Sequence, residues 1–280
     1  MPTQGNDRMT WISSYPRSGN TWVRFLIVNC LVDHEFDWDT AMNAFAFELY
    51  YYLERMRDDG WSKQDVIDKL KSVVKDQPTA GMFGDTVYMK SHNRWSDDHP
   101  FAEYTDRAIL IVRNPRDVLL SGANYHNLMV DPDTPAVEYA REFIEHGGDP
   151  RWIRNGYGTW FEHYQSWTNA SFPVHVVRYE DLKSDPIQPL MAMCKFLGFE
   201  VSKEDAARAA ERTKIAKLRD VEHKARQAGR ITDFNAGFNF FNKGKSGQSL
   251  DDLEPGLDEK FDRAFAEQMG ATGYSPRARV

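Results

Sequence analysis

Four short apolar runs restrict the folds that this 280-residue chain can adopt. Each run is bounded by turn or polar residues, as are the strands of a parallel sheet that is covered on both faces. The runs are Trp11–Tyr15, Thr86–Lys90, Ala108–Val112 and Val174–Tyr179. Helical patterns separate them, and such alternation requires right-handed crossovers between parallel strands. The sequence therefore predicts an α/β fold in which helices flank a parallel sheet.

The segments between and after these runs have the spacing of apolar residues that is typical of helices. The expected helices are Thr21–Val32, Thr40–Arg57, Lys63–Val74, Asp117–Met129, Pro135–His146, Trp152–Trp167, Pro186–Leu197 and Lys203–Leu218. No linker divides the chain, so we expect a single domain over residues 1–280, with its motifs inside 11–248. The stretch Asp220–Gln248 differs, because it combines four glycines with basic residues and an aromatic run at 237–241. Long loops of this kind are often functional, and we expect this one to close over a ligand or cofactor.

Composition argues against several classes of protein. The net charge of −7 is wrong for a sequence-blind nucleic-acid binder, whose surface would be basic. No stretch approaches the roughly 20 apolar residues of a membrane helix, and the first residues lack a signal-peptide pattern. Cys30 and Cys194 are far apart, and we expect two reduced thiols. We therefore expect a cytoplasmic protein with no membrane span.

A turn and a helix follow the first strand in the sequence WISSYPRSGNTWVR, residues 11–24. The first backbone N–H groups of a helix have no partner within the helix and, with the helix dipole, favour a bound anion. Residues 18–21 would supply these groups, and Arg17 adds a positive charge. A phosphate or sulfate cradle is one interpretation, and a plain turn whose Ser or Asn caps the helix is the other.

This turn is not a Walker loop, which needs G-x-x-x-x-G-K-[ST]. The G-K-S triplet at 244–246 has Asn239 where the first glycine would stand, and it does not follow a strand.

A second set of cations follows the third strand. Arg113 ends that strand, Pro115 stands where a helix can begin, and Ser121 shares a helix face with Asp117. Arg113 and Ser121 would then meet a phosphate near the strand end, or Arg113 and Arg116 would pair with acidic neighbours such as Asp117. Two anion sites at the carboxyl ends of parallel strands suit one ligand with phosphates at both ends.

Five segments together resemble the sulfotransferases. YPRSGNTW at 15–22 is similar to their 5′-phosphosulfate loop, usually YPKSGTTW, and RNPRD at 113–117 with Ser121 is similar to their 3′-phosphate motif. KSH at 90–92 resembles the segment of their catalytic histidine, YEDL at 179–182 matches a strand end, and 243–247 resembles their late glycine loop. The five segments occur along this chain in the same order as in the family. The resemblance implies a P-loop-like sheet and an enzyme that uses 3′-phosphoadenosine 5′-phosphosulfate (PAPS) and no metal.

The resemblance also implies roles for single residues. Arg17 takes the place of the loop lysine and would neutralise the leaving 5′-phosphate, although a guanidinium does not give up a proton. The 5′-phosphate would bind the donors of four loop residues, and an aromatic residue would lie beneath the loop or near the adenine. These residues are Ser18, Gly19, Asn20 and Thr21, followed by Trp22.

His92 would be the general base that removes the proton of the attacking hydroxyl. A lone histidine at a strand end is more often a packing residue, but strand alternation puts Lys90 on the same side, where it could hold the sulfuryl oxygens. The 3′-phosphate would bind Arg113 and Ser121, with Lys243 and Gly244 completing its pocket.

The family's arginine in the late loop is replaced by Asn242, and Lys245 is a candidate substitute. Tyr179 and Thr213 would lie near the adenine, with ordinary packing as an even alternative for both.

The acceptor is expected to be a small molecule. Three segments, 36–61, 125–157 and 226–241, would form its pocket, and all three are rich in aromatic residues. Such residues suit an aromatic, steroid-like or long apolar alcohol, although helix core explains Phe45–Tyr52 equally well. The chain resembles bacterial small-molecule sulfotransferases, and a carbohydrate or peptide acceptor stays open. The rival functions are a small-molecule kinase and a non-catalytic nucleotide-binding protein.

Overall fold

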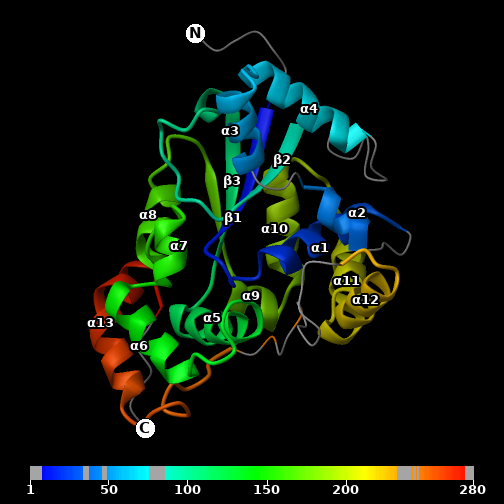
Figure 1. The fold of residues 1–280 in the computed structure, drawn as a ribbon. Coiled ribbons are helices and arrows are strands. Elements are labelled where there is room, and N and C mark those ends of the chain that lie inside the picture. The colour runs from blue at the N-terminus through cyan, green and yellow to red at the C-terminus, as the bar shows by residue number, and fades with distance from the viewer. Residues whose placement is uncertain are drawn as a thin grey trace.

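A four-stranded parallel sheet forms the centre of the protein (Figure 1). In this computed structural model of the chain, the residues described are 8–33, 38–45, 49–75, 86–231, 241, 244 and 246–274. The strands are β1 (Arg8–Ser14), β2 (Thr86–Ser91), β3 (Thr105–Val112) and β4 (Val174–Arg178), in the order β2-β1-β3-β4. All three pairings are parallel, so the carboxyl ends of the four strands lie at one edge of the sheet.

Successive residues of the strands face opposite sides of this sheet, and each side has its own hydrophobic layer. Trp11 and Leu110 pack with helices α4 (Lys63–Lys75), α5 (Pro115–Met129), α6 (Ala136–His146), α7 (Pro150–Arg154), α8 (Trp160–Thr168) and α13 (Leu257–Ala271). Ile12 and Ile109 pack with α1 (Asn20–Leu31), α2 (Trp38–Asn43), α10 (Ile187–Leu197), α11 (Lys203–Arg212) and α12 (Ile215–Gln227). Because the side-chain period of a strand is two, β1 contributes to both layers and is buried from Met9 to Ser14, whereas the outer strand β4 is only partly buried and exposes Val176.

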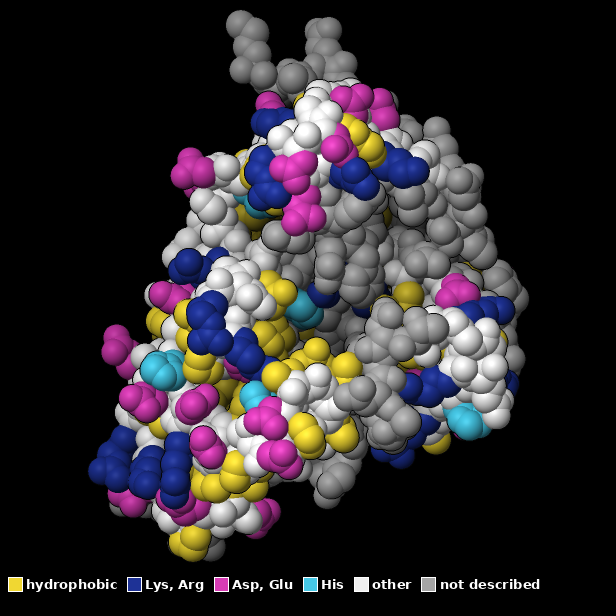
Figure 2. All heavy atoms as spheres, viewed as in Figure 1, with side chains coloured by type: hydrophobic (Ala, Val, Ile, Leu, Met, Phe, Trp, Pro, Cys, Tyr) yellow, Lys and Arg dark blue, Asp and Glu magenta, His cyan; other side chains and the backbone are white. Residues whose placement is uncertain are grey.

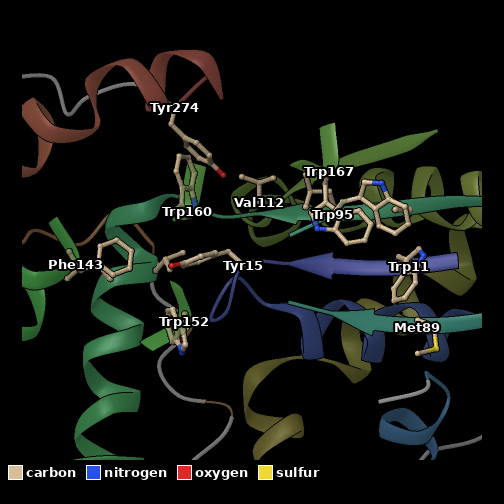
Figure 3. Close-up of a cluster of buried hydrophobic side chains, with 14 of the residues drawn as sticks. Trp11, Tyr15, Met89, Trp95, Val112, Phe143, Trp152, Trp160, Trp167 and Tyr274 are labelled. Carbon is tan, nitrogen blue, oxygen red and sulfur yellow. The ribbon is translucent and has the colours of Figure 1, made fainter. Parts of the chain in front are cut away.

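The first of these layers is dominated by aromatic rings. The indole rings of Trp11 and Trp95 lie 6.1 Å apart, and those of Trp95 and Trp167 lie 5.3 Å apart (Figure 3). At the other end of β1, Tyr15 packs edge-on against Trp152 at 5.5 Å. These contacts fix the end of β1, and with it the turn that leads into α1.

The four predicted strands are confirmed, with boundaries that differ by a few residues. Two predicted helices are divided in the structure. The stretch Thr40–Arg57 is divided between α2 and α3 (Leu49–Asp58), and Trp152–Trp167 is divided between α7 and α8. In the second case Gly156 and Gly158 adopt φ values of 86° and 75°, which end a helix.

The prediction of a loop over Asp220–Gln248 was wrong in its first part. The predicted helix Lys203–Leu218 is interrupted at Thr213, and α12 then continues to Gln227. The helical pattern of α12 was missed because few of its residues are buried and one of them is a glutamate, Glu222, which is 2% exposed. Its carboxylate pairs with Arg226 at 2.8 Å and accepts a hydrogen bond from the Phe241 backbone at 3.1 Å. Residues 232–240, 242, 243 and 245 lie outside the described residues.

Two further helices were not predicted, α9 (Tyr179–Ser184) directly after β4 and the C-terminal α13. Both cysteines are free and buried, as expected, in α1 and α10. In the described ranges, no helix is long and apolar enough to cross a bilayer.

Candidate active site

The turn between β1 and α1 has the geometry of an anion cradle. The Ser18 backbone N–H donates to the Tyr15 carbonyl at 3.3 Å, and Gly19 adopts a φ of 96° that glycine tolerates best. No side chain caps the N-terminus of α1, which contradicts the alternative of a capped turn. Ser18 is 1% exposed, and its hydroxyl has no hydrogen-bond partner among the described residues. Free backbone donors and an orphaned hydroxyl fit a bound phosphate or sulfate.

Two other predicted cradle residues are engaged in part. The Asn20 side chain donates to the Ile12 carbonyl at 3.0 Å, so this residue offers its backbone N–H to a ligand. The Thr21 hydroxyl accepts a hydrogen bond from Arg24 at 3.2 Å. Arg24 is buried one turn further along α1 and lines the same cavity, which the sequence had not indicated.

Arg17 connects the two predicted anion sites. Its φ is 67°, it donates from Nε to the Ser121 hydroxyl at 3.2 Å, and its guanidinium lies 5.1 Å from the centroid of the Tyr125 ring. Burial lowers the pKa of Arg17 to about 10, so the side chain stays charged at neutral pH. The Arg17 carbonyl accepts a hydrogen bond from Arg113 at 2.9 Å.

The arginines after β3 have different partners. Arg116 pairs with Asp258 at 2.8 Å and also with Asp262, so it anchors α13. Arg113 lies in the cavity, 4.4 Å from the centroid of the Tyr179 ring. Arg116 therefore pairs with acidic residues of α13 and not with the expected neighbour Asp117, whereas Arg113 contacts the cradle.

Asp117 holds the late loop in place. Its carboxylate is 1% exposed and accepts hydrogen bonds from the backbone of Gly247 at 3.0 Å and of Gln248 at 3.3 Å. The helix that carries Ser121 is thereby fixed to the segment that carries Gly244.

His92 follows β2 and has a defined tautomer. The Ser14 carbonyl lies 2.7 Å from His92 Nδ1, and a carbonyl can only accept, so Nδ1 carries the proton. Nε2 is then the unprotonated nitrogen. Burial and the nearby Lys90 lower the pKa of His92 well below 6.5, and the Ser14 carbonyl opposes this shift. The imidazole is therefore neutral at pH 7, as a general base must be.

One cavity of about 1180 Å³ joins these groups. The space-filling view shows a hollow near the middle of the molecule, with basic and hydrophobic side chains at its rim (Figure 2). It is lined by twelve of the predicted residues: Arg17, Gly19, Asn20, Thr21, Trp22, Lys90, His92, Arg113, Ser121, Tyr179, Thr213 and Gly244. Ser18 is not among the residues that line the cavity, and Lys243 is outside the described residues. The Thr213 hydroxyl donates to the Ala209 carbonyl at 2.8 Å, so this residue contributes less polarity than expected.

The end of the cavity near His92 is partly aromatic. The rings of His92 and Tyr157 are 6.0 Å apart, and Leu120, Tyr125 and Trp152 also line the wall. Asn124 and Asn155, which the sequence had not singled out, add two amides. Asn124 lies three residues after Ser121 on α5, and that spacing was the available signal.

The predicted acceptor segment 36–61 contributes no described residue to this cavity wall. Trp38 and Phe45 are 6% and 0% exposed in the core, and Trp38 packs against Phe25 at 5.9 Å, so the core interpretation is correct for these two. Side chains 46–52 lie outside the description.

Comparisons with known proteins indicate the family and the fold of the chain. Residues 7–273 match the model of the sulfotransferase domain. A 3-beta-hydroxysteroid sulfotransferase of Cavia porcellus is 28% identical over 280 residues, covering 97% of this chain and 86% of that protein. Sulfotransferase 1A1 of Canis lupus familiaris is 24% identical over 275 residues, covering 96% and 86%.

Solved structures share the fold. A retinol dehydratase complexed with androsterone and the inactive cofactor PAP superposes with a TM-score of 0.63, at 18% identity, over 93% of this chain and 80% of that one. A mouse sulfotransferase complexed with PAP also gives 0.63, at 20% identity, over 95% and 86%. The fold and the cavity define an α/β enzyme built around an anionic substrate. The chain belongs to the sulfotransferase family.

Proposed function

We propose that this sulfotransferase moves a sulfuryl group from PAPS to a hydroxyl or amine of a small-molecule acceptor, with His92 as general base. One observation carries the proposal: His92, with Nδ1 committed to Ser14, lines the same cavity as the open N-terminus of α1 and the guanidiniums of Arg17 and Arg113. A base and two anion-binding groups thus face one space.

The donor would be held at both of its phosphates. The 5′ end suits the cradle, where the backbone N–H groups of residues 19–21 offer donors and Arg17 adds charge. The 3′-phosphate suits Arg113 and Ser121, with Gly244 beside them at the cavity wall. We place Lys243 in this pocket by its position next to Gly244. Trp22 and Tyr179, whose rings are 5.3 Å apart, suit the adenine. The segment from Phe241 to Gln248 would cover the donor.

In the reaction, the acceptor oxygen bonds to sulfur as the bond from sulfur to the bridging oxygen of the 5′-phosphate breaks. The acceptor proton moves to Nε2 of His92, while Lys90 faces the sulfuryl oxygens. Negative charge grows on the departing phosphate, where Arg17 and the α1 N-terminus stabilise it. A guanidinium stays protonated at neutral pH, so Arg17 acts by charge and not by proton transfer.

The acceptor end favours an aromatic or apolar alcohol. Three aromatic rings and a leucine offer apolar area, while Asn124 and Asn155 would orient a second polar group of the acceptor. The similarity to a hydroxysteroid sulfotransferase supports a ring-bearing alcohol as the first class to assay.

Labelled PAPS, a panel of phenols, steroids, sugars and amines, and calorimetry with adenosine 3′,5′-bisphosphate (PAP) test the proposal. We expect His92→Ala to lower turnover at least about 100-fold while the affinity for PAP stays nearly unchanged. The matched control is His223→Ala, because His223 is exposed on α12 and does not line the cavity.

Three outcomes would contradict the proposal. Full turnover by His92→Ala removes the assigned base. Binding of Mg·ATP in preference to PAP indicates a kinase. Tight binding of PAP with no label consumed across the panel indicates a non-catalytic nucleotide-binding protein.

A further inference from the structure

Lys183 lies at the end of the cavity that is opposite His92. The strand order β2-β1-β3-β4 places His92, the cradle, Arg113 and Tyr179 one after another along the carboxyl edge of the sheet. Helix α9 begins at Tyr179, and Lys183 stands four residues later, on the same face of that helix. Lys183 is therefore on the Arg113 side of the cradle, away from the base.

The Lys183 ammonium lies near Gly244, which also lines the cavity. A Cβ built on Gly244 would lie 3.6 Å from Lys183 Nζ and 3.6 Å from the Tyr179 hydroxyl oxygen. The guanidinium of Arg113 lies 4.4 Å from the centroid of the same Tyr179 ring. Two cations thus flank Tyr179, and both line the cavity.

The charge of Lys183 is not balanced by a carboxylate within the described part of the chain, where no ion pair of this side chain occurs within 4.0 Å. Lys214 offers the contrast, because it lines the same cavity from the start of α12 but pairs with Glu211. Two cations that lie near the same tyrosine and line the same cavity suit a phosphate dianion.

We propose that Lys183 binds the 3′-phosphate of the donor, together with Arg113, and so helps to select donors that carry this group. This inference rests on the proposed function, because it takes PAPS as the donor. The 5′ end of that donor is placed at the cradle on β1, so the phosphate near β3 and β4 is the 3′ one. Lys183 belongs to neither of the two loops from which the sequence predicted this pocket.

Calorimetry with two ligands distinguishes specific binding of the 3′-phosphate by Lys183 from a general effect of Lys183 on the nucleotide site. PAP and adenosine 5′-monophosphate differ only by the 3′-phosphate, so the ratio of their Kd values measures the contribution of that group. We expect Lys183→Ala to raise the Kd for PAP about tenfold, the low end for a charge-assisted hydrogen bond because the side chain is exposed. The Kd for the monophosphate should change less than about twofold.

Two further variants complete the design. Lys183→Arg keeps the charge and should restore most of the affinity for PAP, whereas Lys214→Ala should leave both Kd values unchanged. The inference is refuted if Lys183→Ala weakens both ligands equally, weakens neither, or is matched by Lys214→Ala. If the parent enzyme binds neither ligand, the proposed donor is wrong, and this outcome is distinct from a failure of the role given to Lys183. Replacing an exposed lysine typically changes the free energy of unfolding by no more than about 0.5 kcal/mol, so each variant should fold.

Discussion

Gly19 offers a sharp test of how the cradle is built. Two effects oppose a side chain here. The residue has a φ of 96°, and a Cβ would lie 2.6 Å from Cδ2 of Tyr179. A left-handed conformation costs a residue other than glycine about 1–2 kcal/mol. The clash adds to this cost, because the Tyr179 ring has to move.

Movement of Tyr179 disturbs its two ring contacts. The edge-on contact with Trp22 at 5.3 Å is typically worth about 0.5–1.5 kcal/mol, and the contact with Arg113 at 4.4 Å about 0.5–2 kcal/mol. Gly19→Ala should therefore lower the free energy of unfolding by about 2–5.5 kcal/mol in total. It should also weaken PAP binding at least about tenfold, since Arg113 shifts with the ring.

Gly198→Ala is the matched control, because Gly198 has a φ of 89° and no atom within 4 Å of a built Cβ. It should show the cost of the left-handed backbone alone, about 1–2 kcal/mol, with unchanged affinity for PAP. Urea unfolding and calorimetry measure both quantities. If the two variants lose equal stability and both bind PAP like the parent, the contact between Gly19 and Tyr179 has no role in the site.

Three other predictions concern protonation and the packing of α13. The pKa of His92 is held well below 6.5, so kcat/KM should be flat around pH 7 and fall only as the pH drops through that lowered value. A fall in kcat/KM that begins at or above pH 7 would contradict the assignment of His92 as the general base. The same shift makes protonation favour the unfolded chain, so the free energy of unfolding should decrease below pH 6.5 in the parent, and by less in His92→Ala. Arg116→Ala removes a side chain that is 4% exposed and pairs with two aspartates, and urea unfolding should show a loss of about 3–5 kcal/mol in the free energy of unfolding. A loss as small as that of the exposed Arg263→Ala would mean that the pairs contribute little.

The sheet and the cradle could be predicted because both depend on local sequence. Apolar runs of five or six residues between turn residues define buried strands, and the Pro-Arg-Ser-Gly-Asn turn fixes its own geometry through Gly19. His92 and Arg113 were found through motifs at strand ends, and parallel strands bring such ends together whatever the intervening length.

Other features depend on contacts that a sequence does not display. The burial of Glu222 is favourable only because Arg226 and the Phe241 backbone meet it, so α12 resembled a polar loop. Lys183 was overlooked because the end of α9 and Gly244 become neighbours only in the fold. For Thr213 the sequence left ligand contact and packing open, and in the fold its hydroxyl donates to the Ala209 carbonyl at the end of α11 while the residue lines the cavity.

The position of β2 in the sheet has a consequence for how this enzyme can diversify. The proposed donor site is built mainly on β1 and β3, each of which has a strand on both sides, whereas His92 follows β2, which within the described residues pairs with β1 alone. A central strand cannot shift without breaking two ladders, but an outer one can be reshaped at lower cost. Libraries that vary the surroundings of β2 should therefore yield catalysts for new alcohols that still use the original coenzyme.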